Sequence, residues 1–141
     1  MAVEYRKLVD EDLNLFIEMR ISQLQEEGAK AIFDLKPYLQ DYYTRHLDDN
    51  TFVSWLAVDK NRIIGTSGMS FVEKPPYYSC PSGKIGLLSS MYVIKEYRRK
   101  GIQTNLIKEC IKFAKKNRII NLKLSSDNQE AIRIYQGQGF E

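Results

Sequence analysis

The pattern of apolar and polar residues predicts short strands alternating with amphipathic helices. After Asp10, apolar residues recur at spacings of three and four, which predicts a helix that Asp10 caps and Gly28 ends. A second helix is predicted from Lys36 to about His46, because Pro37 favours the first turn of a helix. Two helices therefore precede the long strands of the chain.

Shorter apolar runs predict the strands. Residues 3–8 predict one short strand, and residues 52–58 and 63–71 predict two antiparallel strands joined by a turn at 59–62. Residues 85–94 are mostly apolar and too few for a typical amphipathic helix, so they predict a buried strand.

An amphipathic helix follows this buried strand and leads to another strand. Its apolar residues fall at spacings of three and four, whereas its lysines lie largely elsewhere. The apolar positions are Ile102, Leu106, Ile107, Cys110, Phe113 and Ala114. Residues 119–124 form the next strand, so the three segments predict a βαβ crossover with parallel strands.

A last helix is predicted from a capping box. Asp127 takes the N-cap position and Glu130 reaches back to it. This helix carries Tyr135 on its apolar face and stops at the sequence Gln-Gly-Gln-Gly. The predicted element order is β-α-α-β-β-β-α-β-α, in a single domain over residues 1–141.

Length, charge and cysteine content limit the class of protein. The 141 residues suffice for one domain with a core, and the net charge of +3 is too small to indicate nucleic-acid binding. No apolar run approaches the roughly 18 residues of a membrane span, and residues 1–13 carry too many charges for a signal peptide. Cys80 and Cys110 lack metal-ligand spacing and predict reduced thiols in the cytoplasm.

The turn before the helix at 102 carries candidate chemistry. It is a basic run of Arg98, Arg99 and Lys100 followed by Gly101, and no acidic residue occurs between them and Glu109. The first N–H groups of a helix lack intrahelical partners and carry partial positive charge. A glycine lets a phosphate approach those groups closely. The segment therefore predicts a site for a phosphorylated ligand, although a solvated charge run would contain the same cations.

Two nucleotide motifs are excluded by single positions. A P-loop would require glycine at position 78, and a dinucleotide fingerprint would require glycines at 103 and 106. The chain has Tyr78, Gln103 and Leu106 there. The basic turn is therefore neither of these motifs.

Two segments together resemble the GNAT superfamily of acyl-CoA-dependent N-acyltransferases. Arg-x-x-Gly-x-Gln at 98–103 is similar to the family's pyrophosphate loop, except that Gln103 stands where glycine or alanine is usual. Its side chain either lowers the affinity or hydrogen-bonds the ligand instead. Asn-x-x-Ala-x-x-x-Tyr-x-x-x-Gly-Phe at 128–140 matches the family's second motif in full.

The resemblance implies a fold of the α/β (α+β) class, with a mixed, strongly twisted sheet flanked by helices. GNAT domains usually continue past the Gly-Phe of the second motif into a final strand pair, whereas the given sequence stops at Glu141. Three alternatives stay open. The gene product is longer, another chain closes the sheet, as a homodimer would, or the sheet keeps an open edge.

The resemblance also implies an activity and a set of site residues. The activity is transfer of an acetyl group from acetyl-CoA to a primary amine of a small molecule or a protein, without a metal. Tyr135 would donate a proton to the leaving thiol, or else only pack on the sheet. Asn128 would contact the pantetheine arm, or else only cap a helix. The backbone of residues 91–93 would pair with pantetheine like an added strand. The implied cofactor-binding residues are Met91, Tyr92, Val93, Arg98, Arg99, Lys100, Gly101, Ile102, Gln103, Thr104, Asn128 and Tyr135.

The general base and the acceptor are less defined. Glu26, Glu27 and Glu73 lie near the expected acceptor site, but surface carboxylates are common, and His46 is assigned no catalysis. Tyrosines at 77–78 and the two helix-end glutamates suggest an aromatic or cationic acceptor. Two other classes compete, a non-catalytic CoA-binding regulatory domain and a basic nucleic-acid module. The second is disfavoured because aromatic stacking motifs are absent.

Overall fold

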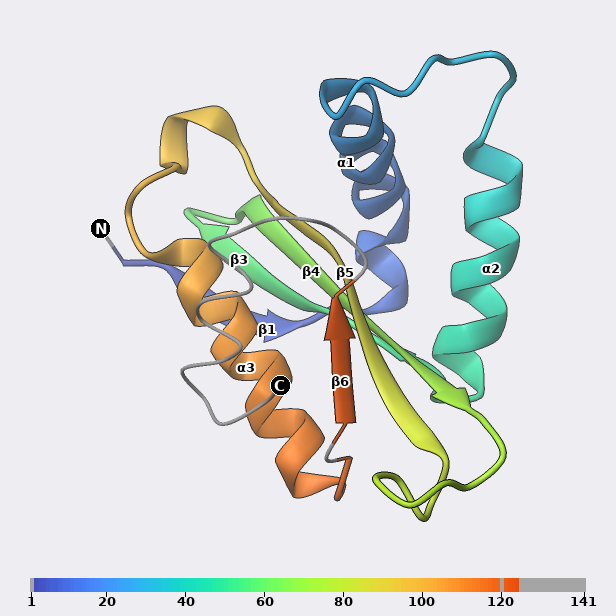
Figure 1. Cartoon of the computed structure of the whole chain (residues 1–141). Coiled ribbons are helices and arrows are strands. Elements are labelled where there is room, and N and C mark those ends of the chain that lie inside the picture. Colours follow the sequence, from blue (N-terminus) through green and yellow to red (C-terminus); the bar gives the residue numbers. More distant parts are fainter. Residues whose placement is uncertain (1, 120, 125–141) are drawn as a thin grey trace.

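The described part of the chain folds into a six-stranded sheet with helices on both faces (Figure 1). The computed structural model describes residues 2–119 and 121–124. The helices are α1 (Leu13–Glu26), α2 (Lys36–Asp48) and α3 (Ile102–Lys116), with 3₁₀ turns at Asp10–Asp12 and Lys95–Tyr97. The strands are β1 (Glu4–Lys7), β2 (Phe52–Val53), β3 (Trp55–Asp59), β4 (Arg62–Glu73), β5 (Lys84–Val93) and β6 (Asn121–Leu124).

The strand order confirms the predicted crossover. The sheet runs β1-β3-β4-β5-β6, with β2 paired to β4, and the pairs are antiparallel except for β5 and β6. These two strands are parallel, with Ile85 opposite Asn121 and Leu88 opposite Leu124. α3 connects them, as the apolar pattern predicted, and the mixed sheet flanked by helices confirms the expected fold class.

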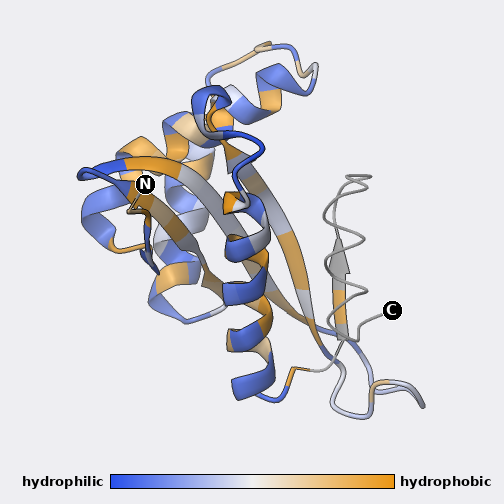
Figure 2. Ribbon diagram, turned by 90° about the vertical axis from the view of Figure 1, so that its left-hand side faces the viewer, coloured by the Kyte–Doolittle hydropathy of each residue, from blue (hydrophilic) through white to orange (hydrophobic). Residues whose placement is uncertain are grey.

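Alternation along the central strands builds two apolar layers. Leu56 and Ile63 pack with α1 and α2, whereas the adjacent Ala57 and Ile64 pack with α3. Successive side chains of a strand point to opposite faces, so the two layers lie on opposite sides of the sheet. α3 turns hydrophilic residues outward and its apolar stripe inward (Figure 2).

The turn predicted between β3 and β4 is a two-residue hairpin loop. Asp59 pairs with Arg62, and the two residues between them, Lys60 and Asn61, have φ angles of 52° and 63°. Such left-handed pairs match the twist of antiparallel strands. The turn is therefore short and places Asp59 beside the loop that precedes α3.

The first α-helix begins two residues later than a helix capped by Asp10 would begin. Residues Asp10–Asp12 form a 3₁₀ turn, and α1 begins at Leu13. It is the Asp12 carboxylate, not that of Asp10, that accepts the Val9 N–H at 3.0 Å. Two hydrogen bonds from the Arg6 guanidinium, at 2.8 and 3.0 Å, hold Asp12 in this position.

The predicted strand at 52–58 is interrupted at Ser54, which separates β2 from β3. The hydroxyl of Ser67 on β4 enters the ladder here. It accepts the Trp55 N–H at 3.0 Å and donates to the Trp55 carbonyl at 2.8 Å. The Ser54 hydroxyl donates to the Ser67 carbonyl. Serine side chains thus replace backbone bonds, which the apolar pattern could not indicate.

We predict that Asp12→Ala lowers the free energy of unfolding by about 1 kcal/mol at pH 7, because the Val9 N–H and the Arg6 guanidinium both lose their carboxylate acceptor. Hydrogen bonds from Arg6 hold the pKa of Asp12 below its ordinary value. Because this pKa is lower in the folded than in the unfolded protein, ionised Asp12 stabilises the fold fully at pH values above the unfolded pKa, near 4. That stabilisation is lost as the pH falls through the folded pKa. Urea unfolding at pH 7 and at about pH 2.5 checks this.

Asp10→Ala is the matched control, because Asp10 is exposed and lies only two residues away in the same 3₁₀ turn. It should change the free energy of unfolding little at either pH. If Asp10→Ala were the more harmful substitution at pH 7, the role assigned to the Asp12 carboxylate would be wrong.

Candidate functional site

The start of α3 leaves its first backbone donors open. Gly101 occupies the N-cap position with a φ of 78°, and no side chain of the described residues caps the helix there. The first intrahelical hydrogen bond of this turn runs from the Asn105 N–H to the Gly101 carbonyl at 3.1 Å. The N–H groups of residues 102–104 precede it and have no intrahelical acceptor. The first turn contains no acidic residue, so nothing in it opposes an anion.

A cavity of about 400 Å³ lies against this helix start. Three segments line it, the end of α1, the end of β5, and the loop that leads into α3. The lining residues are Gln23, Glu26, Glu27, Met91, Tyr92, Val93, Tyr97, Arg98, Arg99, Gly101, Ile102 and Gln103. The structure thus brings together eight of the predicted cofactor-binding residues around one space.

Gly101 faces open space rather than protein. A Cβ built on it would meet no heavy atom within 4 Å. Its left-handed backbone disfavours any L-residue, so the position combines a turn that needs glycine with a clear approach to the helix N–H groups. Arg99, two residues earlier, is also left-handed at a φ of 65°.

A β-bulge lies in β5 beside the cavity. Thr66 pairs with Tyr92 and Gly68 with Ser89, so two residues of β5 lie opposite one residue of β4. Ser90 has a φ of 56° and is buried. Its carbonyl accepts the Thr66 hydroxyl at 3.0 Å. The bulge lies just before the last residues of β5, which line the cavity.

The end of β5 is open on the side of β6. The two strands pair only over Ile85–Leu88, so the residues after Leu88 have no strand partner on that side among the described residues. Side chains bind two carbonyls of this segment. Gln23 Nε2 donates to the Met91 carbonyl at 3.3 Å, and Arg98 Nε donates to the Val93 carbonyl at 2.8 Å. This edge suits a ligand that pairs with the backbone like a strand.

Arg98 is held by two elements. Besides the Val93 carbonyl, its Nη2 donates to both carboxylate oxygens of Glu26, at 3.0 and 2.7 Å. The pair joins the end of α1 to the loop before α3, and both side chains are more than a third exposed. Arg98 therefore lines the cavity with its charge paired to Glu26. The sequence had suggested an unpaired positive charge at this position.

Two predicted cofactor-binding residues lie outside the cavity lining. The Lys100 ammonium lies 5.5 Å from the ring centroid of Tyr97 and faces a separate hollow beside Asp59 and Glu96. Thr104 does not line the cavity either, although its backbone N–H belongs to the first turn of α3. The structure therefore brings Arg98 and Arg99 to the cavity and leaves Lys100 beside it.

The loop before α3 is tied to the β3–β4 turn. The Tyr97 hydroxyl donates to Asp59 Oδ2 at 2.6 Å, and this hydrogen bond raises the pKa of Tyr97. Arg62 and Glu96 form a second link at 3.7 Å. These contacts fix the loop that presents Arg98. Sequence reasoning missed them because the partners lie more than thirty positions apart.

Gln23 is a further residue that sequence reasoning missed. It is 5% exposed and accepts a hydrogen bond from Arg20 at 3.1 Å. The only indication in the sequence is its spacing, since it falls four residues after Met19 and seven after Phe16, on the apolar stripe of α1.

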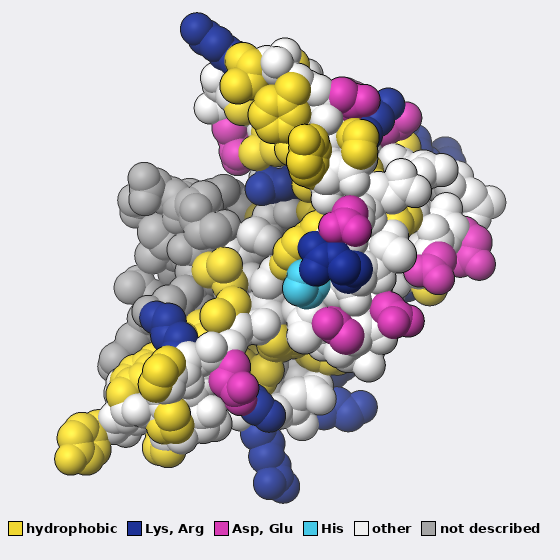
Figure 3. Space-filling model, turned by 90° about the vertical axis from the view of Figure 1, so that its right-hand side faces the viewer, with side chains coloured by type: hydrophobic (Ala, Val, Ile, Leu, Met, Phe, Trp, Pro, Cys, Tyr) yellow, Lys and Arg dark blue, Asp and Glu magenta, His cyan; other side chains and the backbone are white. Residues whose placement is uncertain are grey.

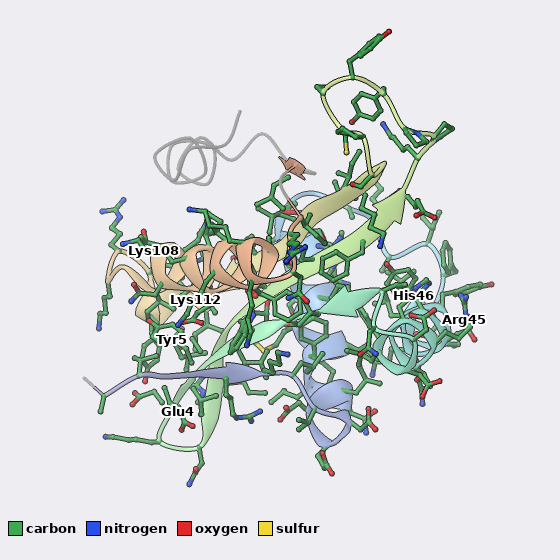
Figure 4. All side chains as sticks on the ribbon, turned by 90° about the horizontal axis from the view of Figure 1, so that it is seen from below. Glu4, Tyr5, Arg45, His46, Lys108 and Lys112 are labelled. Atoms are coloured by element: carbon green, nitrogen blue, oxygen red, sulfur yellow. The ribbon has the colours of Figure 1, made fainter. Side chains whose placement is uncertain are left out.

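The remaining predicted residues fall elsewhere. Asn128 and Tyr135 lie outside the described residues. Glu73 ends β4 and is exposed. The His46 ring lies 4.1 Å from that of Tyr42, and Figure 4 shows His46 and Arg45 across the molecule from Lys108 and Lys112 on α3. His46 therefore has a structural contact and lies away from the helix start.

Exposed apolar side chains gather at two ends of one face (Figure 3). One group lies on and beside the α1–α2 loop and contains Ile32, Phe33 and Tyr38. The other belongs to the β4–β5 hairpin and contains Tyr77 and Tyr78. The second group includes both tyrosines that the sequence suggested for acceptor contact.

Two further properties concern the described residues only. No three His, Cys, Asp or Glu side chains among residues 2–119 and 121–124 could hold a metal ion together. None of the helices in the same residues has the length and apolar character needed to cross a membrane.

Cys80 and Cys110 are buried thiols, and burial raises the pKa of Cys110 to about 12.

Comparisons with known proteins agree on one family. The sequence model described as the acetyltransferase (GNAT) family matches residues 17–140. N-acetyltransferase 8B of Rattus norvegicus is 26% identical over 106 residues, which are 73% of this chain and 46% of the rat protein. Histone acetyltransferase MCC1 of Arabidopsis thaliana is 26% identical over 154 residues, 96% of this chain and 58% of that protein. The chain thus spans about half the length of these relatives.

Solved structures show the same fold. A "predicted acetyltransferase" of Clostridium acetobutylicum, solved with acetyl-CoA, superposes with a TM-score of 0.90 at 29% identity, covering 99% of this chain and 90% of that one. A GCN5-related N-acetyltransferase of Ralstonia eutropha JMP134 superposes with a TM-score of 0.87 at 22% identity, covering 99% and 93%.

Proposed function

Because this chain belongs to the acetyltransferase (GNAT) family, we propose that it transfers an acetyl group from acetyl-CoA to a primary amine of a small molecule or a protein. The cavity at the start of α3 is the observation that carries this proposal. Its backbone donors are open, and the position of Gly101 leaves room for a phosphate beside them. Family membership and a structural relative solved with acetyl-CoA support the choice of ligand.

The described residues fit the diphosphate and pantetheine parts of such a ligand. The N–H groups of residues 102–104 would bind the diphosphate, because a helix N-terminus favours anions. Arg99 adds an exposed positive charge at the cavity. The open edge of β5 after its bulge would hold the pantetheine arm through backbone hydrogen bonds.

The reaction requires that the acceptor nitrogen attack the acetyl carbonyl carbon as the carbon–sulfur bond breaks. An amine of pKa about 10.4 is mostly protonated at pH 7, so its proton must leave first, to a base or to water. Tyr135 is the proposed donor to the departing thiolate. It is carried over from the resemblance and lies outside the described residues.

The acceptor would approach between the two apolar groups of Figure 3. Tyr77 and Tyr78 on the hairpin remain available there as aromatic contacts. Glu26 is less suited to a cationic acceptor than its sequence position suggested, because Arg98 already neutralises it. We place the reaction in the cytoplasm, where buried thiols such as Cys80 and Cys110 stay reduced.

Thiol release from acetyl-CoA, measured against a panel of amines, tests the proposal. The panel should include arylamines, polyamines, lysine and peptide N-termini, with acetyl-CoA hydrolysis as the blank. We expect amine-dependent release with at least one class. If coenzyme A binds but no amine accelerates release, the protein is instead a non-catalytic CoA-binding domain.

We predict that Glu26→Gln strengthens coenzyme A binding about two- to fivefold, because it releases Arg98 from its carboxylate partner. The affinity should also fall more steeply with salt than in the wild type, since one more free cation contributes. Calorimetry at two salt concentrations measures both. Glu18→Gln, an exposed glutamate of α1, is the control for the change of net charge. Weaker binding of Glu26→Gln would mean that Glu26 orients Arg98 for the ligand.

A further inference from the structure

Gln103 is the one residue of the basic loop motif that departs from the family's usual glycine or alanine. It is the second residue of α3 and one of the residues that line the cavity at the helix start. Its Nε2 atom is buried and has no hydrogen-bond partner among the residues that the structure describes. A glutamine whose only task was to fill space would not need to place its donor there.

A buried amide without an acceptor costs free energy, because it loses its bonds to water without replacing them. Such groups are rare in proteins and call for an explanation, and a ligand is one. Gln103 lines the cavity and belongs to the helical turn that carries the open backbone donors, so a rotation of its side chain would bring the amide to a ligand bound there. An anionic oxygen bound by those donors would also lie near this amide.

The charges around the cavity make a neutral donor useful. Two arginines and two glutamates line it, Arg98, Arg99, Glu26 and Glu27. Arg98 is paired with Glu26. Lys100 was predicted to add a third cation, but its ammonium lies over the Tyr97 ring and outside the cavity lining. The side-chain charges therefore nearly cancel, so binding of a diphosphate depends strongly on neutral N–H donors.

We propose that the Gln103 side-chain amide donates a hydrogen bond to a diphosphate oxygen of coenzyme A, as a donor added to the helix N–H groups. Gln103 is then a binding residue that contributes to the selection of the diphosphate-bearing ligand. This inference rests on the proposed function and adds to it a side chain that this chain holds in place of the family's glycine or alanine.

The proposal and its alternative predict changes of opposite sign. If Gln103 donates to the ligand, Gln103→Ala weakens coenzyme A binding. If Gln103 only occupies space, Gln103→Ala enlarges the site and strengthens binding. Gln103→Met keeps nearly the same length without a donor, so it should also weaken binding under the proposal.

Calorimetric titration with coenzyme A and with pantetheine, which lacks the diphosphate, is the test. We expect both Gln103 variants to bind coenzyme A about tenfold or more weakly than the wild type, the effect of losing one hydrogen bond to a charged group. Pantetheine binding should not change. Gln40→Ala, an exposed glutamine on α2, is the control and should leave both affinities unchanged. Equal or tighter coenzyme A binding by Gln103→Ala would overturn the inference.

Two further readouts separate ligand binding from folding. Without ligand, Gln103→Ala should melt at the wild-type temperature or above, because the amide has no described partner to lose and alanine favours helices. The Gln103 side-chain amide signal can be assigned by NMR because it is missing from the spectrum of Gln103→Ala. In the wild type, this signal should shift when coenzyme A is added. A signal that does not move at saturation would overturn the inference. If the folded wild type does not bind coenzyme A at all, the proposed function fails first.

Discussion

Gly101→Ala is expected to weaken coenzyme A binding about a hundredfold while the protein stays folded. The added methyl meets no protein atom within 4 Å, so it does not clash in the ligand-free protein. It would instead stand in the space through which a phosphate reaches the N–H groups of α3. Losing one or two hydrogen bonds to a charged group accounts for an effect of this size. Calorimetry with coenzyme A measures it.

Gly28→Ala is the matched control for the backbone. Gly28 has a φ of 100° and also meets no atom within 4 Å, but it follows α1 and does not line the cavity. Both variants bear the cost of a left-handed alanine, about 1–2 kcal/mol. Only Gly101→Ala should lose ligand affinity. Similar affinity losses in both variants would show that the effect comes from stability, not from the phosphate approach.

Tyr135→Phe is expected to lower turnover at least a hundredfold, with little change in coenzyme A affinity. The magnitude is that of a general acid removed from its reaction, because the departing thiolate then lacks its proton donor. Steady-state rates with the best acceptor of the amine panel measure kcat, and calorimetry measures binding.

Tyr5→Phe, which removes a hydroxyl on β1 outside the cavity lining, controls for the loss of a hydroxyl. It should retain wild-type turnover. If Tyr135→Phe were equally active, another group would have to protonate the thiolate, and Tyr135 would be reduced to packing on the sheet.

The fold was predictable where it depended on periodicity. The stripe that begins at Ile102 repeats every three or four residues, and the runs on either side are too short for helices, so β5, α3 and β6 followed from pattern alone. Local chemistry was less decisive. Asp10 and Asp12 are both of a type suited to a helix start, and Asp12 makes the hydrogen bonds there because Arg6, on a different element, holds its carboxylate.

The site was predictable as a location but not as an electrostatic balance. Gly101 and the helix start could be identified from adjacent residues, because a turn and a helix are local structures. The partner of Arg98 could not, since Glu26 lies 72 positions away and meets it only after the sheet and α1 have packed. Lys100 was predicted to bind phosphate because it belongs to the basic run. Its ammonium instead lies over the Tyr97 ring, beside the cavity.

Titration of the wild-type protein with coenzyme A, followed by calorimetry and repeated with pantetheine, tests the central claim most directly. If backbone amides at the start of α3 bind the diphosphate, coenzyme A should bind with a dissociation constant below about 1 mM, within the usual range of enzyme–substrate affinities. Pantetheine should bind at least about tenfold more weakly. A folded protein that binds neither ligand, or that binds both equally well, would contradict the account.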